Sequence, residues 1–166
     1  APLTDLTKKK FPNKVTWSAE TEGAFSSLIA YLTNSPILCL PDWDAQFILR
    51  TDASNSGIGC VLMQKYGDQN FPIAYSSRKL LPRETRYSTI EKEGLAIVWG
   101  IQKFECYLYG QEFVLETDHA PLIYINKAKM SNPRIMRWCL ALQPYRFRVE
   151  YIKGSDNVGA DFLSRS

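Results

Sequence analysis

A four-residue pattern, Leu-Xaa-Thr-Asp, occurs twice in the chain and constrains its fold more than any other feature. It stands at Leu49-Arg50-Thr51-Asp52 and again at Leu115-Glu116-Thr117-Asp118, each time at the end of a β-rich run. A segment with helical periodicity, residues 84–108, separates the two runs. Strand–helix–strand units are right-handed and pair their strands in parallel. The pattern therefore predicts that Asp52 and Asp118 meet at one edge of a sheet, where open α/β sheets place their sites.

The remaining segments predict a mixed sheet covered by helices. The expected strands are residues 46–52, 58–64, 71–76, 112–118 and 147–152, and the first three form an antiparallel meander. Further helices are expected at 121–126, at 133–142 and from residue 158. This order, β-β-β-α-β-α-α-β-α, predicts an α/β domain with a five-stranded sheet over residues 45–166. Residues 1–44 are predicted to form a helical lead-in, with Ser18 as a helix N-cap.

The composition removes several classes of function. With 45% hydrophobic and 22% charged residues, the chain is expected to be a soluble globular protein. No apolar run is long enough to span a bilayer, and the start predicts a piece of a longer protein without a signal peptide. The four cysteines are far apart, which argues against a zinc site, and His119 is the only histidine, which excludes sites with two or more imidazoles. Carboxylates remain as the candidates for chemistry.

The charge distribution indicates one possible partner. The net charge is only +3, but the C-terminal part from Lys127 onward holds eight Lys or Arg against three acids. Such a basic region fits a surface that faces phosphates. It fits an ordinary solvated basic face equally well.

Two aspartates that meet at a sheet edge repel each other, and a cation relieves that repulsion. Ligation by oxygen alone selects a hard ion such as Mg²⁺ or Mn²⁺. An Asp after a strand is also common turn chemistry, but the matched pair favours the metal site. Glu91 and Glu93 flank the apolar stripe of the long helix on opposite sides, so periodicity does not choose between them. Asp161 lies in the expected last helix.

Six ordered stretches carry a resemblance to a known family: FILRTDASNSGIGCVLMQ, IAYSSRKL, YSTIEKEGLAIVWGIQKFECYLYG, FVLETDHAPL, RIMRW and DNVGADFLSRS. They resemble the ribonuclease H domain of gypsy-type long-terminal-repeat retrotransposon polyproteins. Residues 1–44, with PLTDLTKK and SPILCLPDW, resemble the connecting tail of the reverse transcriptase that precedes this domain.

The resemblance implies a ribonuclease H fold and four catalytic, metal-binding acids: Asp52, Glu93, Asp118 and Asp161. Glu93 is the helical acid because it precedes the Gly-Leu-Ala-Ile run, and Glu91 is then expected to be solvated. The implied reaction is two-metal hydrolysis of the RNA strand of an RNA–DNA hybrid, with two Mg²⁺ ions for which Mn²⁺ substitutes. Asp52 would bridge the ions.

The resemblance also implies contacts with the hybrid. Ser54, Asn55 and Glu93 are expected near the RNA 2′-hydroxyls, and Arg78, Arg137 and Lys153 near the DNA phosphates. Further candidates are Asn157, Tyr151, which stands where cellular and retroviral relatives often carry a His, and His119, for which a structural role is as well supported.

The implied partner is the polymerase domain of the same polyprotein, with no membrane, in an intracellular setting such as a cytoplasmic virus-like particle. Deletion of residues 1–44 is expected to leave specific cleavage largely intact. Two alternatives stay open. One is a catalytically silent or host-adopted module that binds nucleic acid or a polymerase. The other is an integrase or transposase core, which usually has three acids, so the fourth acid, Asp161, counts against it.

Overall fold

The computed structural model describes residues 2–6, 16–33, 38–118 and 133–165, which form two compact units, Ala1–Ile37 and Leu38–Ser166. The first unit holds helix α1 (Pro2–Asp5) and helix α2 (Ala19–Thr33). Ser18 caps α2 as predicted, because its Oγ accepts the N–H of Thr21 at 3.3 Å and Thr21 Oγ1 accepts the N–H of Ser18 at 2.8 Å. The apolar side chains Phe25 and Leu28 on α2 are exposed.

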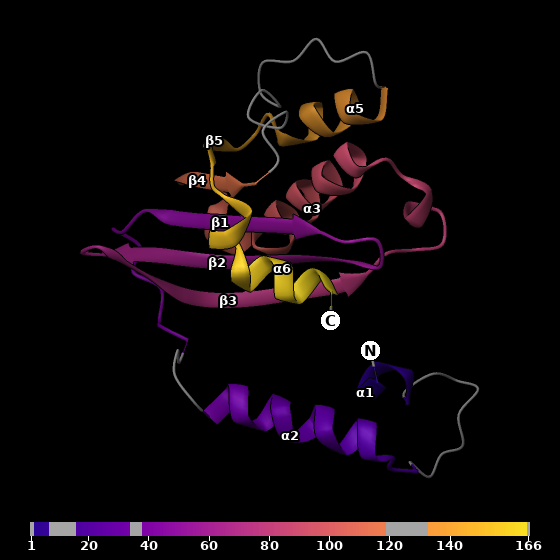
Figure 1. Ribbon diagram of the computed structural model, residues 1–166. Coiled ribbons are helices and arrows are strands. Elements are labelled where there is room, and N and C mark those ends of the chain that lie inside the picture. The colour runs from indigo at the N-terminus through magenta and orange to yellow at the C-terminus, as the bar shows by residue number, and fades with distance from the viewer. Residues whose placement is uncertain (1, 7–15, 34–37, 119–132, 166) are drawn as a thin grey trace. The chain divides into compact units, whose positions relative to one another are not determined.

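The second unit is built on a five-stranded mixed sheet in the order β3-β2-β1-β4-β5 (Figure 1). Its strands are β1 (Phe47–Ala53), β2 (Gly57–Tyr66), β3 (Gln69–Lys79), β4 (Glu112–Thr117) and β5 (Arg146–Tyr151). The first three strands pair antiparallel, whereas β4 is parallel to both β1 and β5. The predicted meander and the predicted parallel pairing of the two Leu-Xaa-Thr-Asp strands are therefore confirmed.

Helices cover both faces of the sheet because the strands point apolar side chains alternately to each side. On one face lie α3 (Thr89–Lys103) and α5 (Pro133–Leu142), over a core that includes Phe47, Leu49 and Leu115. On the other face, α6 (Val158–Arg165) packs on Ile48 and Val61 (Figure 1). None of the helices within the described residues combines the length and apolarity that a membrane span requires.

Glycines let both helices approach the centre of the sheet closely. A Cβ atom at Gly59 on β2 would stand 2.7 Å from the carbonyl oxygen of Ala160 and 2.8 Å from the amide nitrogen of Ser164, both on α6. A Cβ atom at Gly100 on α3 would stand 3.3 Å from the Cγ2 atom of Thr51. Only a residue without a side chain permits the first of these contacts. The end of β1 is thus enclosed between α3 and α6.

The prediction of one continuous helix over residues 84–108 is wrong. Residues Glu84–Arg86 form a short 3-10 turn, α3 begins at Thr89, and a separate helix α4 (Glu105–Leu108) follows a break at Phe104. Ser88 and Glu91 form a complete capping box, which fixes the start of α3. The preceding Glu84 is buried and accepts hydrogen bonds from Arg78 and from the N–H of Leu81 instead. The predicted helix at 121–126 lies outside the described residues.

Residues 38–44, which the sequence assigns to the lead-in, pack against the sheet. The N–H of Cys39 donates to the carbonyl of Pro72 at 2.8 Å, and the ring of Trp43 stacks on Tyr107 with centroids 6.0 Å apart. The buried amide of Gln64 accepts from the N–H of Asp42 at 2.9 Å. These contacts place the segment with the second unit. A functional boundary after residue 44 stays a prediction.

Candidate metal centre

Three carboxylates from three separate elements converge at one edge of the sheet. Asp52 lies near the end of β1, Asp118 directly follows β4, and Glu93 lies on α3. One oxygen atom from each lies within 4.8 Å of the other two. The structure thus brings together the two aspartates of the repeated pattern, because parallel strands end at the same edge.

Glu93 is the helical acid that faces this edge. Its side chain is buried, and its Oε2 atom has no hydrogen-bond partner among the described residues. Glu91 instead completes the capping box with Ser88 and forms an ion pair with Arg134 on α5. The expectation that Glu91 is merely solvated is therefore wrong, since it fastens the start of α3 to α5.

Burial and nearby negative charges make Glu93 and Asp52 hard to ionise in the absence of a cation. Burial raises the pKa of Glu93 to about 9, and the nearby charges of Asp52 and Asp118 add to the effect. Burial also raises the pKa of Asp52, partly offset by a hydrogen bond from Ser164, and the charges of Asp118 and Asp161 raise it further. A bound cation would favour the ionised form of both side chains.

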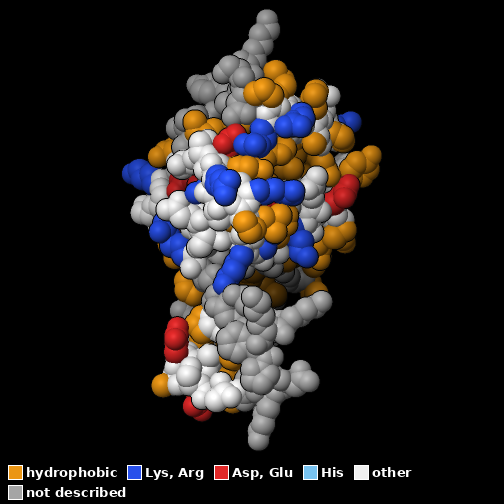
Figure 2. Space-filling model, turned by 90° about the vertical axis from the view of Figure 1, so that its right-hand side faces the viewer, with side chains coloured by type: hydrophobic (Ala, Val, Ile, Leu, Met, Phe, Trp, Pro, Cys, Tyr) orange, Lys and Arg blue, Asp and Glu red, His pale blue; other side chains and the backbone are white. Residues whose placement is uncertain are grey.

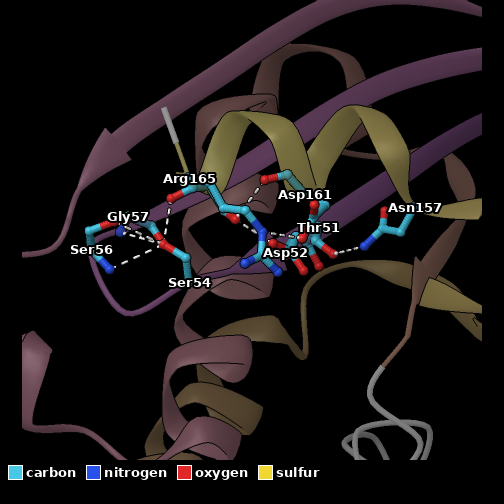
Figure 3. A network of polar contacts seen from close by, with 9 residues as sticks. Thr51, Asp52, Ser54, Ser56, Gly57, Asn157, Asp161 and Arg165 are labelled. Carbon is cyan, nitrogen blue, oxygen red and sulfur yellow. Dashed lines mark hydrogen bonds and ion pairs between the residues drawn. The ribbon is translucent and has the colours of Figure 1, made fainter. Parts of the chain in front are cut away.

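Helix α6 brings Asp161 and two further side chains to the cluster (Figure 3). Asp161 lies beside Asp52 but outside the group of three, and its Oδ1 atom pairs with Nε of Arg165 at 2.6 Å. Ser164 donates its hydroxyl hydrogen to Oδ2 of Asp52. Sequence reasoning missed Ser164 and Arg165. The four-residue spacing of Asp161 and Arg165 was a usable signal for a helical ion pair, whereas Ser164 gave none.

The turn after β1 holds two of the predicted RNA contacts. The hydroxyl oxygen of Ser54 accepts the N–H groups of Ser56 and Gly57 at 3.1 and 3.0 Å and donates to the carbonyl of Ser164 at 2.5 Å (Figure 3). Ser54 therefore shapes the turn and anchors α6. Asn55 is exposed, and its Oδ1 atom accepts a hydrogen bond from Nζ of Lys92 at 3.0 Å.

The other predicted contacts differ in their surroundings. Arg78 forms a bidentate ion pair with the buried Glu84, in which Nη1 lies 2.6 Å from Oε2 and Nη2 lies 3.2 Å from Oε1. Asn157 is fully buried and donates to the carbonyl of Thr51 at 3.2 Å, so the expected direct contact with nucleic acid does not fit this structure. The exposed candidates are Arg137, Tyr151 and Lys153, and His119 lies outside the described residues.

The donor set fits a hard divalent cation. All the converging ligand atoms are carboxylate oxygens, and the described residues contain no imidazole. The unpaired, buried Oε2 atom of Glu93 is the kind of atom that a metal ion would satisfy. The residues that would hold an ion are Asp52, Glu93 and Asp118, with Asp161 adjacent.

The sheet order and the helices on both faces define a ribonuclease H-like fold, and solved structures agree. A foamy viral protease–reverse transcriptase in complex with an RNA/DNA hybrid matches 92% of this chain and 21% of its own, with a TM-score of 0.69 and 21% identity. LC11-RNase H1 in complex with an RNA/DNA hybrid matches 71% of this chain and 93% of its own, with a TM-score of 0.57 and 16% identity.

The family follows from the sequence comparisons. The model of the RNase H-like domain found in reverse transcriptase matches residues 42–145, and this chain belongs to that family. The retrovirus-related Pol polyprotein from transposon 297 of Drosophila melanogaster is 42% identical over 165 residues, which are 99% of this chain and 15% of the relative. The transposon Tf2-3 polyprotein of Schizosaccharomyces pombe is 36% identical over 169 residues, 99% of this chain and 12% of the relative. The chain thus spans less than one sixth of either polyprotein.

Proposed function

We propose that this chain is a metal-dependent endoribonuclease that hydrolyses the RNA strand of RNA–DNA hybrids as the ribonuclease H domain of a retrotransposon reverse transcriptase. The observation that carries the proposal is the convergence of Asp52, Glu93 and Asp118 within 4.8 Å in a ribonuclease H-like fold. Three carboxylates this close together, two of them buried, destabilise a protein unless a bound cation offsets their repulsion.

Asp52, Glu93, Asp118 and Asp161 would hold two Mg²⁺ ions, or Mn²⁺ in their place. When bound, the ions would activate a water molecule and stabilise the leaving oxygen of the phosphodiester. The chain's own residues prepare the acids for this role. Ser164 fixes the rotamer of Asp52 through its hydroxyl, and Arg165 holds Asp161 beside Asp52. Glu93 is oriented by its place on the packed face of α3.

Recognition of the hybrid is proposed to rest on two kinds of contact. Asn55 lies in the turn that follows Asp52, where Lys92 occupies its Oδ1 atom, so its amide N–H groups are the part offered to a 2′-hydroxyl. Figure 2 shows Lys and Arg side chains gathered over one face of the second unit, with few acids among them. Phosphates are expected on such a face. Arg137 and Lys153 are exposed and are proposed as phosphate contacts.

The partner is proposed to be the polymerase domain of the same polyprotein, because both relatives named above are polyproteins of which this chain matches a small part. The gypsy type of the element and the setting in a cytoplasmic particle stay predictions. The second candidate function is a silent nucleic-acid-binding module, which the same experiment tests.

The test is cleavage of a labelled RNA–DNA hybrid in Mg²⁺ or Mn²⁺, with duplex DNA, duplex RNA and single strands as controls. Asp52→Asn should abolish cleavage while retaining binding of the hybrid. The matched control is Asp68→Asn, which removes an exposed carboxylate in the β2–β3 turn and should cleave like the wild type. A folded wild-type chain that binds the hybrid and never cleaves it would instead support the silent module.

A further inference from the structure

The connection between β5 and α6 lies against Asp118 and leads to Asp161. It contains the turn Gly154–Asp156 and leads directly into α6, whose first turn carries Asp161. A Cβ atom at Gly154 would stand 3.3 Å from Oδ2 of Asp118, so the backbone of the turn rests on that carboxylate. The position of this connection therefore sets both the surroundings of Asp118 and the start of the helix that delivers Asp161.

One guanidinium group joins this connection to the two strands that carry the aspartates. Arg50 lies on β1, two residues before Asp52, and its Nη1 atom donates to the carbonyl oxygen of Asp156 at 3.0 Å. Its Nε atom forms an ion pair with Glu116 on β4, two residues before Asp118. Arg50 and Glu116 are also direct partners in the parallel β1–β4 register. The side chain of Arg50 thus links β1 and β4 to the connection that leads into α6, the helix that carries Asp161.

The burial of the Arg50–Glu116 ion pair indicates that the pair positions nearby backbone and adds little to the stability of the fold. The side chains of Arg50 and Glu116 are only 21% and 11% exposed, on the α6 side of the sheet beside the buried Ile48 and Val114. An ion pair withdrawn from water in this way adds little net stability relative to a packed apolar pair. A planar guanidinium does, however, fix the direction of each of its hydrogen bonds.

A second pair in the same sheet provides a comparison. Arg148 and Glu150 on β5 form an ion pair at 2.8 Å, but their side chains are 57% and 48% exposed. Among the described residues, the further hydrogen-bond partner of the Arg148 side chain is the side chain of Gln46, which lies outside the β5–α6 connection. This pair has the chemistry of Arg50 and Glu116 without the link to the site.

We propose that Arg50 is a positioning residue, which clamps the β5–α6 connection to β1 and β4 and thereby sets Asp161 and Asp118 for metal binding. Arg50 does not touch the reacting atoms itself. The metal-binding part of this inference rests on the proposed function, whereas the clamp itself does not. The fully buried Asn157 also ties this connection to β1, because its side-chain amide donates a hydrogen bond to the carbonyl of Thr51.

The experiment compares the double variant Arg50→Met/Glu116→Met with the wild type and with the control Arg148→Met/Glu150→Met. Removing both charges together avoids leaving one buried charge alone. The first readout is hydrogen exchange in the metal-free protein at the amides of Asp156, Asn157 and Asp161, which donate within the connection and the first turn of α6. Protection of these amides should fall by about tenfold or more in the double variant, as expected for a locally loosened segment, and stay unchanged in the control.

The second readout is Mn²⁺ affinity, measured by calorimetry without substrate, together with the kinetics of hybrid cleavage. Loss of a partner behind the metal ligands costs roughly 10- to 100-fold in affinity or rate. The double variant should lose this factor in Mn²⁺ affinity and in kcat, with the KM for the hybrid nearly unchanged. The control should match the wild type in all three quantities.

Arg50→Lys serves as the milder variant should the double variant fail to fold. A single ammonium group keeps a charge beside Glu116 but does not hold the carbonyl of Asp156 at the same time, so it should loosen the same amides. If either folded variant shows the same hydrogen exchange and the same Mn²⁺ affinity as the wild type, the proposed role of Arg50 is wrong. A wild type that neither binds Mn²⁺ nor cleaves the hybrid would instead overturn the proposed function, and hydrogen exchange alone would then decide the clamp.

Discussion

The burial of Glu93, together with the repulsion from Asp52 and Asp118, predicts that the metal-free protein loses stability as the pH rises, and that Glu93→Gln removes most of this loss. Glu93 is buried, lacks a hydrogen-bond partner for Oε2 among the described residues, and faces Asp52 and Asp118. Its ordinary pKa is 4.5, and in the folded chain it lies at about 9. Between these values the folded state holds a proton that the unfolded state has released. The free energy of unfolding must therefore decrease with rising pH across this interval.

The size of the effect follows from the same two values. Each pH unit across the interval corresponds to about 1.4 kcal/mol, and the interval from 4.5 to about 9 gives an upper limit of roughly 6 kcal/mol. Only about 1.4 kcal/mol of this limit is lost by pH 5.5, which lies one unit above the ordinary pKa, and the loss is largely complete near pH 9. A glutamine has no proton to release in this range, and its amide donates to the neighbouring carboxylates instead of repelling them.

The assay is urea unfolding in EDTA at pH 5.5, 7 and 8.5 for the wild type, Glu93→Gln and the control Glu112→Gln, which alters an exposed acid at the start of β4. The wild type and the control should lose several kcal/mol from pH 5.5 to 8.5, within the limit above, and Glu93→Gln should lose much less. Addition of Mg²⁺ at pH 8.5 should restore the wild type and affect Glu93→Gln far less. Equal pH slopes for the wild type and Glu93→Gln would refute the reasoning.

Three further predictions concern α6 and the lead-in. Ser164→Ala removes the hydrogen bond that lowers the pKa of Asp52, so the acidic limb of the pH–rate profile for cleavage should move to higher pH. An unchanged acidic limb would show that this hydrogen bond does not affect the ionisation of Asp52. Gly59→Ala places a Cβ atom 2.7 Å from the backbone of α6 and should lower both the Tm and the cleavage rate. The control Gly23→Ala, where a Cβ atom meets nothing within 4 Å, should preserve both. Equal Tm values for the two variants would contradict the close packing of α6 on β2. Deletion of residues 1–37 should leave hybrid cleavage intact. Deletion of residues 1–44 should lower the Tm, because the stacking of Trp43 on Tyr107 is lost. A folded 38–166 fragment that does not cleave the hybrid would show that residues 1–37 are needed for catalysis.

The topology was predictable because it follows from local patterns. The repeated Leu-Xaa-Thr-Asp runs and the helical segment between them are sufficient to predict parallel strands with Asp52 and Asp118 at one edge. The start of the long helix was less predictable, since Ser88 and Glu91 compete with Glu84 for that position. Only the structure shows that Arg78 binds Glu84 and withdraws it from the helix.

The contacts that support the site were not predictable from spacing. Arg50 meets Asp156 across 106 positions of the chain, and Ser164 meets Asp52 across 112. Periodicity carries no information about such pairs, because they depend on how α6 crosses the sheet. The choice between Glu91 and Glu93 was open for the same reason: the partner of Glu91 is Arg134 on α5, and the packing of α5 on α3 is a tertiary feature.

The most direct test of the proposed metal centre is hybrid cleavage by the purified chain in Mg²⁺ or Mn²⁺, with and without the Asp52→Asn substitution. We predict metal-dependent cutting of the RNA strand alone, no cutting of duplex DNA or duplex RNA, and complete loss in Asp52→Asn with hybrid binding retained. Cleavage that persists in Asp52→Asn, or that proceeds in EDTA, would contradict the assignment of this carboxylate cluster as the catalytic metal centre.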